Sequence, residues 1–267
     1  MSKCRDMPFN TWRLAPLILL MANASCAGMS NPLAGVSNPF AGMSNPFHTA
    51  PAPNPGLRLA QAAISSGSPD TALQVVQSML AKNPADSEAL AAQGDALVAL
   101  NRGDEAEASF AKALKIDPAS LAARIGIGRA RLLAGDAQGA ESAFRLVIAS
   151  QAQDARAYNN LGIALDLQGR HRPAQAAYRE ALANAPDMAG ARVNLGLSLA
   201  LSGDPNGSIG ILRPLAADPQ SSVRVRHDLA VAFAMAGDGV QASLLLERDM
   251  DKSQAKIAVA GFQALRP

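Results

Sequence analysis

The chain has 267 residues and a formal net charge of +2, and 49% of the residues are hydrophobic although only 4% are aromatic. Alanine and leucine therefore carry most of the apolar content, which favours closely packed helices over a β-sandwich rich in β-branched and aromatic residues. The small net charge argues against a dedicated nucleic-acid surface, and because both cysteines, Cys4 and Cys26, lie near the N-terminus, residues 27–267 cannot form a disulfide or a thiolate metal site.

Residues 1–25 are predicted to be a secretory signal peptide. A basic start is followed by an apolar run from Leu14 to Ala22 and then by small residues. The run has about nine residues, whereas a membrane-spanning helix needs about 20. We therefore expect the protein to be exported.

Two processing routes fit the end of this segment. The small residues around Asn23 suit cleavage before Ser25, which would release a soluble periplasmic protein. Alternatively, Ala24-Ser25-Cys26 resembles the end of a bacterial lipobox, although Asn23 stands where an aliphatic residue is usual. Lipidation of Cys26 would give a firm anchor, and Ala27 lacks the aspartate that keeps bacterial lipoproteins at the inner membrane. The expected location is then the periplasmic face of the outer membrane.

Residues 26–52 are predicted to be a low-complexity linker. The stretch "GMSNPLAGVSNPFAGMSNPFH" repeats a seven-residue unit with a glycine, an Asn-Pro pair and one large apolar residue, namely Leu33, Phe40 or Phe47. Proline breaks helix interiors and restricts the residue before it, so no helix runs through three such units. The linker would separate the membrane-proximal end from a folded body.

From residue 53 the sequence repeats itself at a fixed interval. Three prolines mark the interval, because Pro186 follows Pro118 at twice the distance that separates Pro84 from Pro118. In phase with them the chain divides into six frames, which are 53–86, 87–120, 121–154, 155–188, 189–222 and 223–256. Residues 257–267 are assigned to a C-terminal cap, within a helix expected at 251–267 that places Ile257, Val259, Phe262 and Leu265 on its apolar face.

Four positions hold similar residues in all six frames, and each such set of equivalent positions is called a column. The eighth position holds Ala60, Gly94, Gly128, Gly162, Gly196 and Ala230, and the twentieth holds Ala72, Ala106, Ala140, Ala174, Ser208 and Ala242. Small residues in both columns predict two helices whose backbones approach closely, beside a large residue in the twenty-fourth column (Val76, Phe110, Phe144, Tyr178, Leu212, Leu246). The fifteenth column is glycine or asparagine (Gly67, Asn101, Gly135, Gly169, Gly203, Gly237), which ends a helix in the left-handed conformation at little cost.

A helix–turn–helix unit of about 34 residues with these columns resembles the tetratricopeptide repeat. The stretch "AYNNLGIALDLQGRHRPAQAAYREALANAP", residues 157–186, matches the pattern most fully. The resemblance covers residues 53–256 and implies an all-α, right-handed superhelix with an inner groove and a continuous core. Two departures are expected: a shortened first helix at "PNPG", and a kink or an early end at Pro214.

The sequence gives no sign of catalytic chemistry. His48, His171 and His227 lack metal-ligand spacing, and the glycines of "GIGRARLLAGDAQG" (126–139) fall at repeat columns rather than in a dinucleotide loop. The arginines at 124, 129 and 131 and "RHR" at 170–172 favour a solvated helix face over a phosphate site. We therefore expect no enzyme activity, cofactor, metal site or small-molecule substrate.

The tetratricopeptide resemblance implies that the first helix of each pair lines the inner groove. Its ninth position changes from Gln61, Asp95 and Arg129 to Ile163, Leu197 and Val231, so the lining becomes apolar along the chain. The predicted peptide-binding groove lies in the fourth and fifth frames and consists of Asn159, Asn160, Ile163, Asp166, Leu167, Val193, Asn194, Leu197 and Leu201. An exposed apolar groove with polar fixtures suits a helical or extended peptide of a partner protein.

A narrower resemblance suggests the biological setting. A signal peptide with a cysteine, a low-complexity spacer, about six repeats, then "AMAGDGVQASLLLERDM" and a short tail ending in "FQALRP" are similar to the TadD-type lipoprotein family of tight-adherence (Flp) pilus assembly. That resemblance implies an outer-membrane scaffold whose partners are pilus secretion components. The alternative is a periplasmic adaptor for another envelope system, such as polysaccharide export or cell-wall synthesis.

Overall fold

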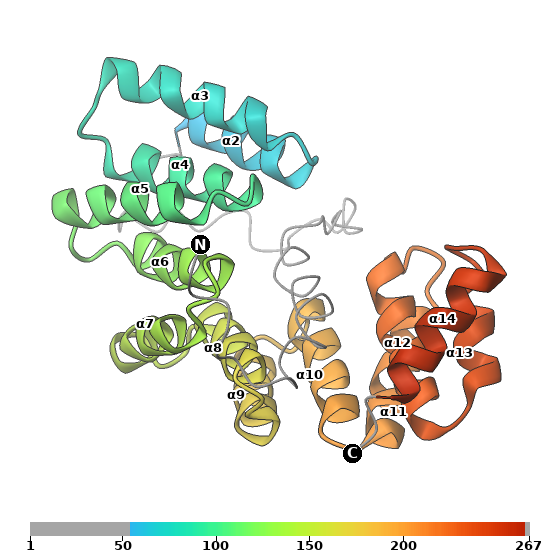
Figure 1. Ribbon diagram of the computed structural model, residues 1–267. Coiled ribbons are helices and arrows are strands. Elements are labelled where there is room, and N and C mark those ends of the chain that lie inside the picture. Colours follow the sequence, from blue (N-terminus) through green and yellow to red (C-terminus); the bar gives the residue numbers. More distant parts are fainter. Residues whose placement is uncertain (1–53, 265–267) are drawn as a thin grey trace, which may run out of the picture. The chain divides into compact units, whose positions relative to one another are not determined.

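The computed structural model describes residues 54–264, and every regular element in that range is an α-helix (Figure 1). The prediction of an all-α fold is confirmed. None of these helices has the length and apolarity needed to cross a membrane. The predicted signal peptide, Cys26 and all of the predicted linker fall outside the described residues.

The helices follow one another in pairs. The first helices are α2 (Pro55–Ser65), α4 (Ser87–Ala99), α6 (Leu121–Leu133), α8 (Ala155–Leu167), α10 (Ala189–Leu201) and α12 (Val223–Ala236). The second helices are α3 (Pro69–Lys82), α5 (Gly103–Ile116), α7 (Ala137–Ser150), α9 (His171–Asn184), α11 (Pro205–Ala216) and α13 (Gly239–Leu246), and α14 (Lys252–Gln263) ends the series. From α4 onward each first helix begins one full repeat after the previous one.

The described residues form two compact units, residues 54–123 and 124–264. In the N-terminal unit α2 packs on α3 and α4, and α4 packs on α5. In the C-terminal unit each helix from α7 to α13 contacts the next, and the first helices α8, α10 and α12 also contact one another in turn. Each unit therefore builds its core from pairs stacked on neighbouring pairs.

The closest approach within a pair is made by the small residue at the eighth position of a frame. A Cβ atom added to Gly162 would lie 2.4 Å from the ring of Tyr178, and one added to Gly94 would lie 2.6 Å from that of Phe110. Real Cβ atoms essentially never approach so closely. Tyr178 and Phe110 are fully buried, as is Ala174 in the twentieth column. The close packing of the paired helices therefore requires small residues in the eighth and twentieth columns.

The turn between paired helices uses a left-handed residue. All five glycines of the fifteenth column have positive φ, and Asn101 (φ 59°) is the single non-glycine residue with positive φ in the described part of the chain. Asparagine tolerates this conformation better than most residues. The predicted left-handed helix ends are therefore present in all six pairs.

Both expected departures occur. Helix α2 has 11 residues, because it begins only at Pro55, where Asn54 caps it by accepting a hydrogen bond from the Gly56 N–H. Helix α11 contains Pro214 and ends at Ala216 after 12 residues, whereas α5, α7 and α9 each have 14. Proline has no N–H to donate and clashes with the preceding turn, which accounts for the early end.

Helix α14 covers the last pair. Ala255 and Val259 are buried in the cluster formed by α12 and α13, and Phe262 packs against it. Ile257 was also expected on this face, and that expectation is wrong, because its side chain is 74% exposed. Residues 255, 259 and 262 recur at helical spacing, whereas 257 is two residues from 259 and points to the opposite side.

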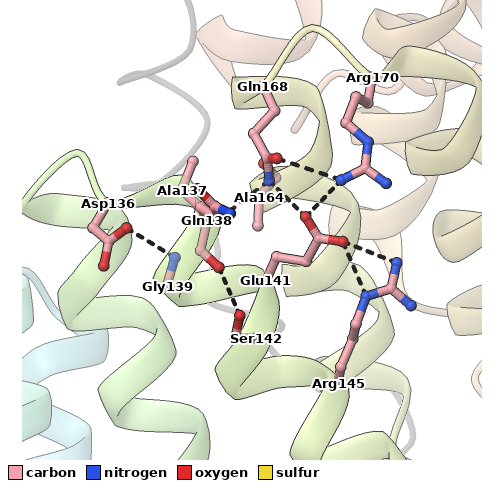
Figure 2. A network of polar contacts seen from close by, with 10 residues as sticks. All are labelled: Asp136, Ala137, Gln138, Gly139, Glu141, Ser142, Arg145, Ala164, Gln168 and Arg170. Carbon is pink, nitrogen blue, oxygen red and sulfur yellow. Dashed lines mark hydrogen bonds and ion pairs between the residues drawn. The ribbon is translucent and has the colours of Figure 1, made fainter.

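A polar joint connects the third and fourth pairs (Figure 2). Glu141 of α7 is 9% exposed and accepts hydrogen bonds from Arg145 Nε (3.0 Å), Gln168 Nε2 (2.9 Å) and Arg170 Nη1 (2.7 Å). Gln168 also donates to the backbone oxygen of Ala137. Burial opposes ionisation of Glu141, but the hydrogen bonds from Gln168 and Arg145 and the charge of Arg170 outweigh it, so the pKa of Glu141 is lowered.

The first prediction tests the steric role of the small columns. Ala174→Leu should destabilise the protein by about 1–3 kcal/mol, because a fully buried contact between α8 and α9 would be overpacked. Ala176→Leu on the same helix is the matched control, since Ala176 is exposed and should change stability by at most about 0.5 kcal/mol. Chemical denaturation followed by circular dichroism measures both. Equal stability of the two variants would contradict the assigned contact.

The second prediction concerns the joint. Glu141→Gln should cost about 1–2 kcal/mol, since it weakens charged hydrogen bonds whose arginine partners are half exposed. The pKa of Glu141 is depressed in the folded state, so its contribution is complete above the ordinary value of 4.5 and is lost as the pH falls through the lower folded pKa. The difference from wild type should therefore shrink in acid. Glu180→Gln, at an exposed site on α9, is the control, and a pH-independent difference would contradict the assignment.

Candidate functional site

The predicted groove residues lie on two neighbouring first helices. Asn159, Asn160, Ile163, Asp166 and Leu167 belong to α8, and Val193, Asn194, Leu197 and Leu201 belong to α10. The two helices contact each other, so the structure brings this set together.

The apolar members of the set are not exposed as the sequence predicted. Ile163 is 2% exposed and Leu197 is 1% exposed. Leu197 packs with Val231 and Met235 of α12, because ninth-position side chains of adjacent first helices meet each other. Leu167 and Leu201 are partly exposed. The expectation of an open apolar groove at Ile163 and Leu197 is therefore wrong, and peptide binding along this face stays a prediction.

Asp166 lies at the centre of a buried polar cluster. Its side chain accepts hydrogen bonds from Tyr178 Oη (2.9 Å) and Ser198 Oγ (2.8 Å), and His171 Nδ1 lies 2.8 Å from Oδ1. Burial, and then the neighbouring carboxylate of Asp166, raise the pKa of Tyr178 well above its ordinary value. Because the Ser198 hydroxyl donates to the carboxylate, and to the backbone oxygen rather than the imidazole ring of His171, this is not the arrangement of an activated nucleophile. The cluster ties α8, α9 and α10 together.

A second polar line crosses three first helices. Asn194 Nδ2 of α10 donates to Asn159 Oδ1 of α8 at 2.9 Å, and Asn194 Oδ1 accepts from the Arg224 guanidinium of α12. Both asparagines were predicted as polar fixtures of the groove. Arg224 was missed, because the sequence offers no sign that its side chain reaches the preceding repeat.

Arg224 also faces Asp228 on its own helix. Arg224 Nε lies 3.5 Å from Asp228 Oδ2, and both side chains are at least nine-tenths buried. Burial raises the pKa of Asp228 to about 7, although Arg224 opposes the shift. A carboxyl whose pKa is raised in the folded state favours folding in acid, and this contribution is lost as the pH rises through about 7. Asp228 is therefore a weak point of the C-terminal unit in neutral and alkaline solution.

The described residues contain no group of three or more His, Cys, Asp or Glu side chains that could hold a metal ion. The polar clusters instead connect neighbouring helices: Glu141 joins α7 to the turn between α8 and α9, Asp166 joins α8 to α9 and α10, and Asn194 joins α10 to α8 and α12. Their common chemical role is to fix the order and register of stacked pairs.

Solved structures share this architecture. A thermophilic tetratricopeptide repeat protein of Thermus thermophilus is 21% identical, covers 67% of this chain and 99% of its own, and has a TM-score of 0.56. PilF of Pseudomonas aeruginosa is 14% identical over 78% of this chain and 95% of its own, with a TM-score of 0.61. YrrB, which is described as having an unusual peptide-binding site, is 16% identical over 71% and 97%, with a TM-score of 0.50. At these identities the likeness shows the fold alone.

No curated protein sequence matches the chain significantly. Two family models described as tetratricopeptide repeat do match it, one over residues 57–121 and 160–222 and the other over residues 97–161. Together they cover residues 57–222, which is more than half of the chain and contains the left-handed turns and the buried small columns of the central pairs. The chain therefore belongs to the tetratricopeptide repeat family.

Proposed function

We propose that this protein is an exported scaffold that helps to assemble a bacterial envelope machine, and specifically the tight-adherence (Flp) pilus. Tetratricopeptide repeats are modules for protein–protein interaction, so other proteins are the partners that this fold suits. The observation that carries the proposal is the order of segments: an export signal, Cys26 in a lipobox-like setting, a proline-rich spacer and then the repeats. This order suits a protein held at a membrane surface that presents its repeats to a partner.

The assignment to pilus assembly depends on the C-terminal end of the chain, from residue 234 onward. The stretch "AMAGDGVQASLLLERDM" contains the end of α12, the left-handed Gly237 and all of α13, and residues 252–263 form the covering helix α14. This ending is similar to that of TadD-type lipoproteins, whereas the repeats are not specific to any envelope system. Without the tail resemblance the same chain suits the second candidate, an adaptor for polysaccharide export or cell-wall synthesis.

Partner binding is proposed to use residues that the repeat fold leaves free. The twentieth and twenty-fourth columns are buried and fixed by packing. The described residues also include partly exposed side chains along the inner helices, among them Leu167 and Leu201. The peptide-binding site that YrrB is described as having is a precedent for such use of this fold.

The third prediction tests the anchor. Cys26→Ala should move the protein from the outer-membrane fraction to the soluble periplasm, because it removes the only residue near the cleavage region that could carry lipid. Ser25→Ala is a matched control that leaves the cysteine in place. Cell fractionation with immunoblotting and intact-mass measurement of the purified wild type decide the question. A mature wild-type chain that begins with an unmodified Ser25 would contradict lipidation.

The fourth prediction tests the proposed role in assembly of the tight-adherence pilus. Deletion of the gene in its host should abolish surface pili of the tight-adherence type, and the wild-type gene should restore them. Electron microscopy and detection of surface pilin measure the effect. Adjacent pilin, secretin and secretion-ATPase genes would support the same conclusion. Normal pili with altered surface polysaccharide or cell wall would overturn the pilus assignment in favour of the second candidate.

A further inference from the structure

A groove lies in the N-terminal unit between α3, α4 and α5. Its volume is about 460 Å³ and it is open to solvent. Its apolar lining consists of Leu80 from α3, Pro84 from the following turn, Leu90 from α4 and Ile116 at the end of α5. Ile116 is 45% exposed, although it is a large aliphatic residue. The groove therefore offers an apolar surface that a partner side chain could cover.

Three polar side chains complete the lining, and all three can donate hydrogen bonds. They are Gln93 of α4 and the lysines Lys112 and Lys115 of α5. Gln93 Oε1 already accepts a hydrogen bond from Ser109 Oγ at 3.2 Å, so the amide nitrogen of Gln93 is the atom that can donate a hydrogen bond to a ligand. Neither lysine forms an ion pair within residues 54–264, and no carboxylate lines the groove there. The groove is therefore positively charged and lacks a carboxylate of its own.

Two of these polar residues depart from what the repeat uses elsewhere. The seventh column is aliphatic in the other five frames (Leu59, Ile127, Leu161, Leu195, Leu229) and holds Gln93 only here. The twenty-ninth column is alanine in four frames (Ala81, Ala149, Ala183, Ala217), whereas the second frame has Lys115. The hydrogen bond from Ser109 gives Gln93 a role within its own helix pair, whereas Lys115 is exposed and has no such partner among the described residues. Both exceptions line the same groove, although they come from different helices.

Simpler accounts explain only part of this pattern. Lysine in the last turn of a helix is favoured by the helix dipole, which would explain Lys115 alone. Lys112 lies a turn earlier, and Gln93 belongs to α4. The dipole therefore does not account for three donors that converge on one apolar groove.

We propose that this groove of the second repeat binds an acidic segment of a partner protein, with an apolar side chain in the groove and flanking carboxylates at Lys112 and Lys115. The charge of the groove favours this partner. Carboxylates on either side of the apolar side chain would pair with the two lysine ammonium groups, which lack ion-pair partners among the described residues. The chain's own residues 27–54 contain no carboxylate, so they do not meet this requirement. The inference rests on the proposed scaffold function and adds a site and the chemistry of the partner.

The test uses the full mature chain and labelled synthetic peptides with one central leucine. One peptide has glutamates on both sides of the leucine, a second has glutamines in their place and a third has lysines. Fluorescence anisotropy should show saturable, salt-sensitive binding of the glutamate peptide and at least about tenfold weaker binding of the other two. No saturable binding of the glutamate peptide, or equal binding of all three, would overturn the proposal.

Variants then locate the site. Lys112→Ala combined with Lys115→Ala should weaken binding of the glutamate peptide by at least about tenfold without unfolding, because alanine is the usual residue in the column of Lys115. Lys252→Ala combined with Lys256→Ala removes the same charge from exposed positions on α14 and is the matched control. Ile116→Ser should weaken binding as well, through the apolar contact. Equal loss in both lysine pairs would indicate a net-charge effect and overturn the groove assignment.

Measuring surface pili in complemented deletion strains distinguishes failure of this inference from failure of the proposed function. If deletion of the gene leaves envelope assembly intact, the scaffold function fails whatever the peptides do. If the wild type restores pili in the deletion strain and the Lys112/Lys115 variant restores them equally, the scaffold function stands and the groove is not its partner site. We expect the variant to restore pili poorly while circular dichroism shows an unchanged helical content.

Discussion

The close approach of two helices within each pair is the constraint on which the rest of the structure depends. It requires a residue without bulk at the eighth position, because a Cβ atom at Gly128 or Gly162 would overlap an aromatic ring of the second helix. The ring then fills the space that the glycine leaves, and the small residue of the twentieth column, such as Ala140 or Ala174, is fully buried in the same region. One steric condition thus links three columns in the second to fifth pairs, where the eighth residue is glycine, and its recurrence contributes to the fixed interval that the sequence displays.

That condition explains why the fold could be predicted from the sequence while much of the candidate site could not. The fold is encoded within each pair, by residues a few turns apart, and is repeated often enough for its columns to be visible. Exposure depends on what packs against a pair from outside. Leu197 looked available for a partner because its column also holds charged residues such as Asp95, yet in the fifth pair it is covered by Val231 and Met235 of the next first helix. The repeat pattern therefore gives the position of a residue on its helix, whereas the neighbouring repeat determines whether the side chain at that position is exposed to solvent.

The polar contacts between pairs escaped prediction for the same reason. Glu141 and Gln168 are 27 residues apart and Asn194 and Arg224 are 30 apart, and neither separation corresponds to a repeat of the sequence pattern. Such contacts occur at single joints, so no column shows them. They nevertheless restrict how one pair can sit on the next, because a buried carboxylate such as Glu141 or Asp166 needs particular donors at particular positions. Apolar columns allow any pair to stack on any other, and these polar joints make the order of pairs specific.

The same distinction gives a way to find function in a repeat array. Residues that packing requires are the same from pair to pair, so they carry no information about a partner. Residues that differ in one pair are either joints, which are satisfied by protein partners as Asp166 is, or they face solvent with unmet hydrogen-bonding capacity. Lys115 is of the second kind, and it lies in one groove with Lys112 and with Gln93, whose amide oxygen is already bound by Ser109. An array of nearly interchangeable units can acquire a specific binding site through a few such exceptions, because changing them leaves the steric contact that holds each pair together untouched.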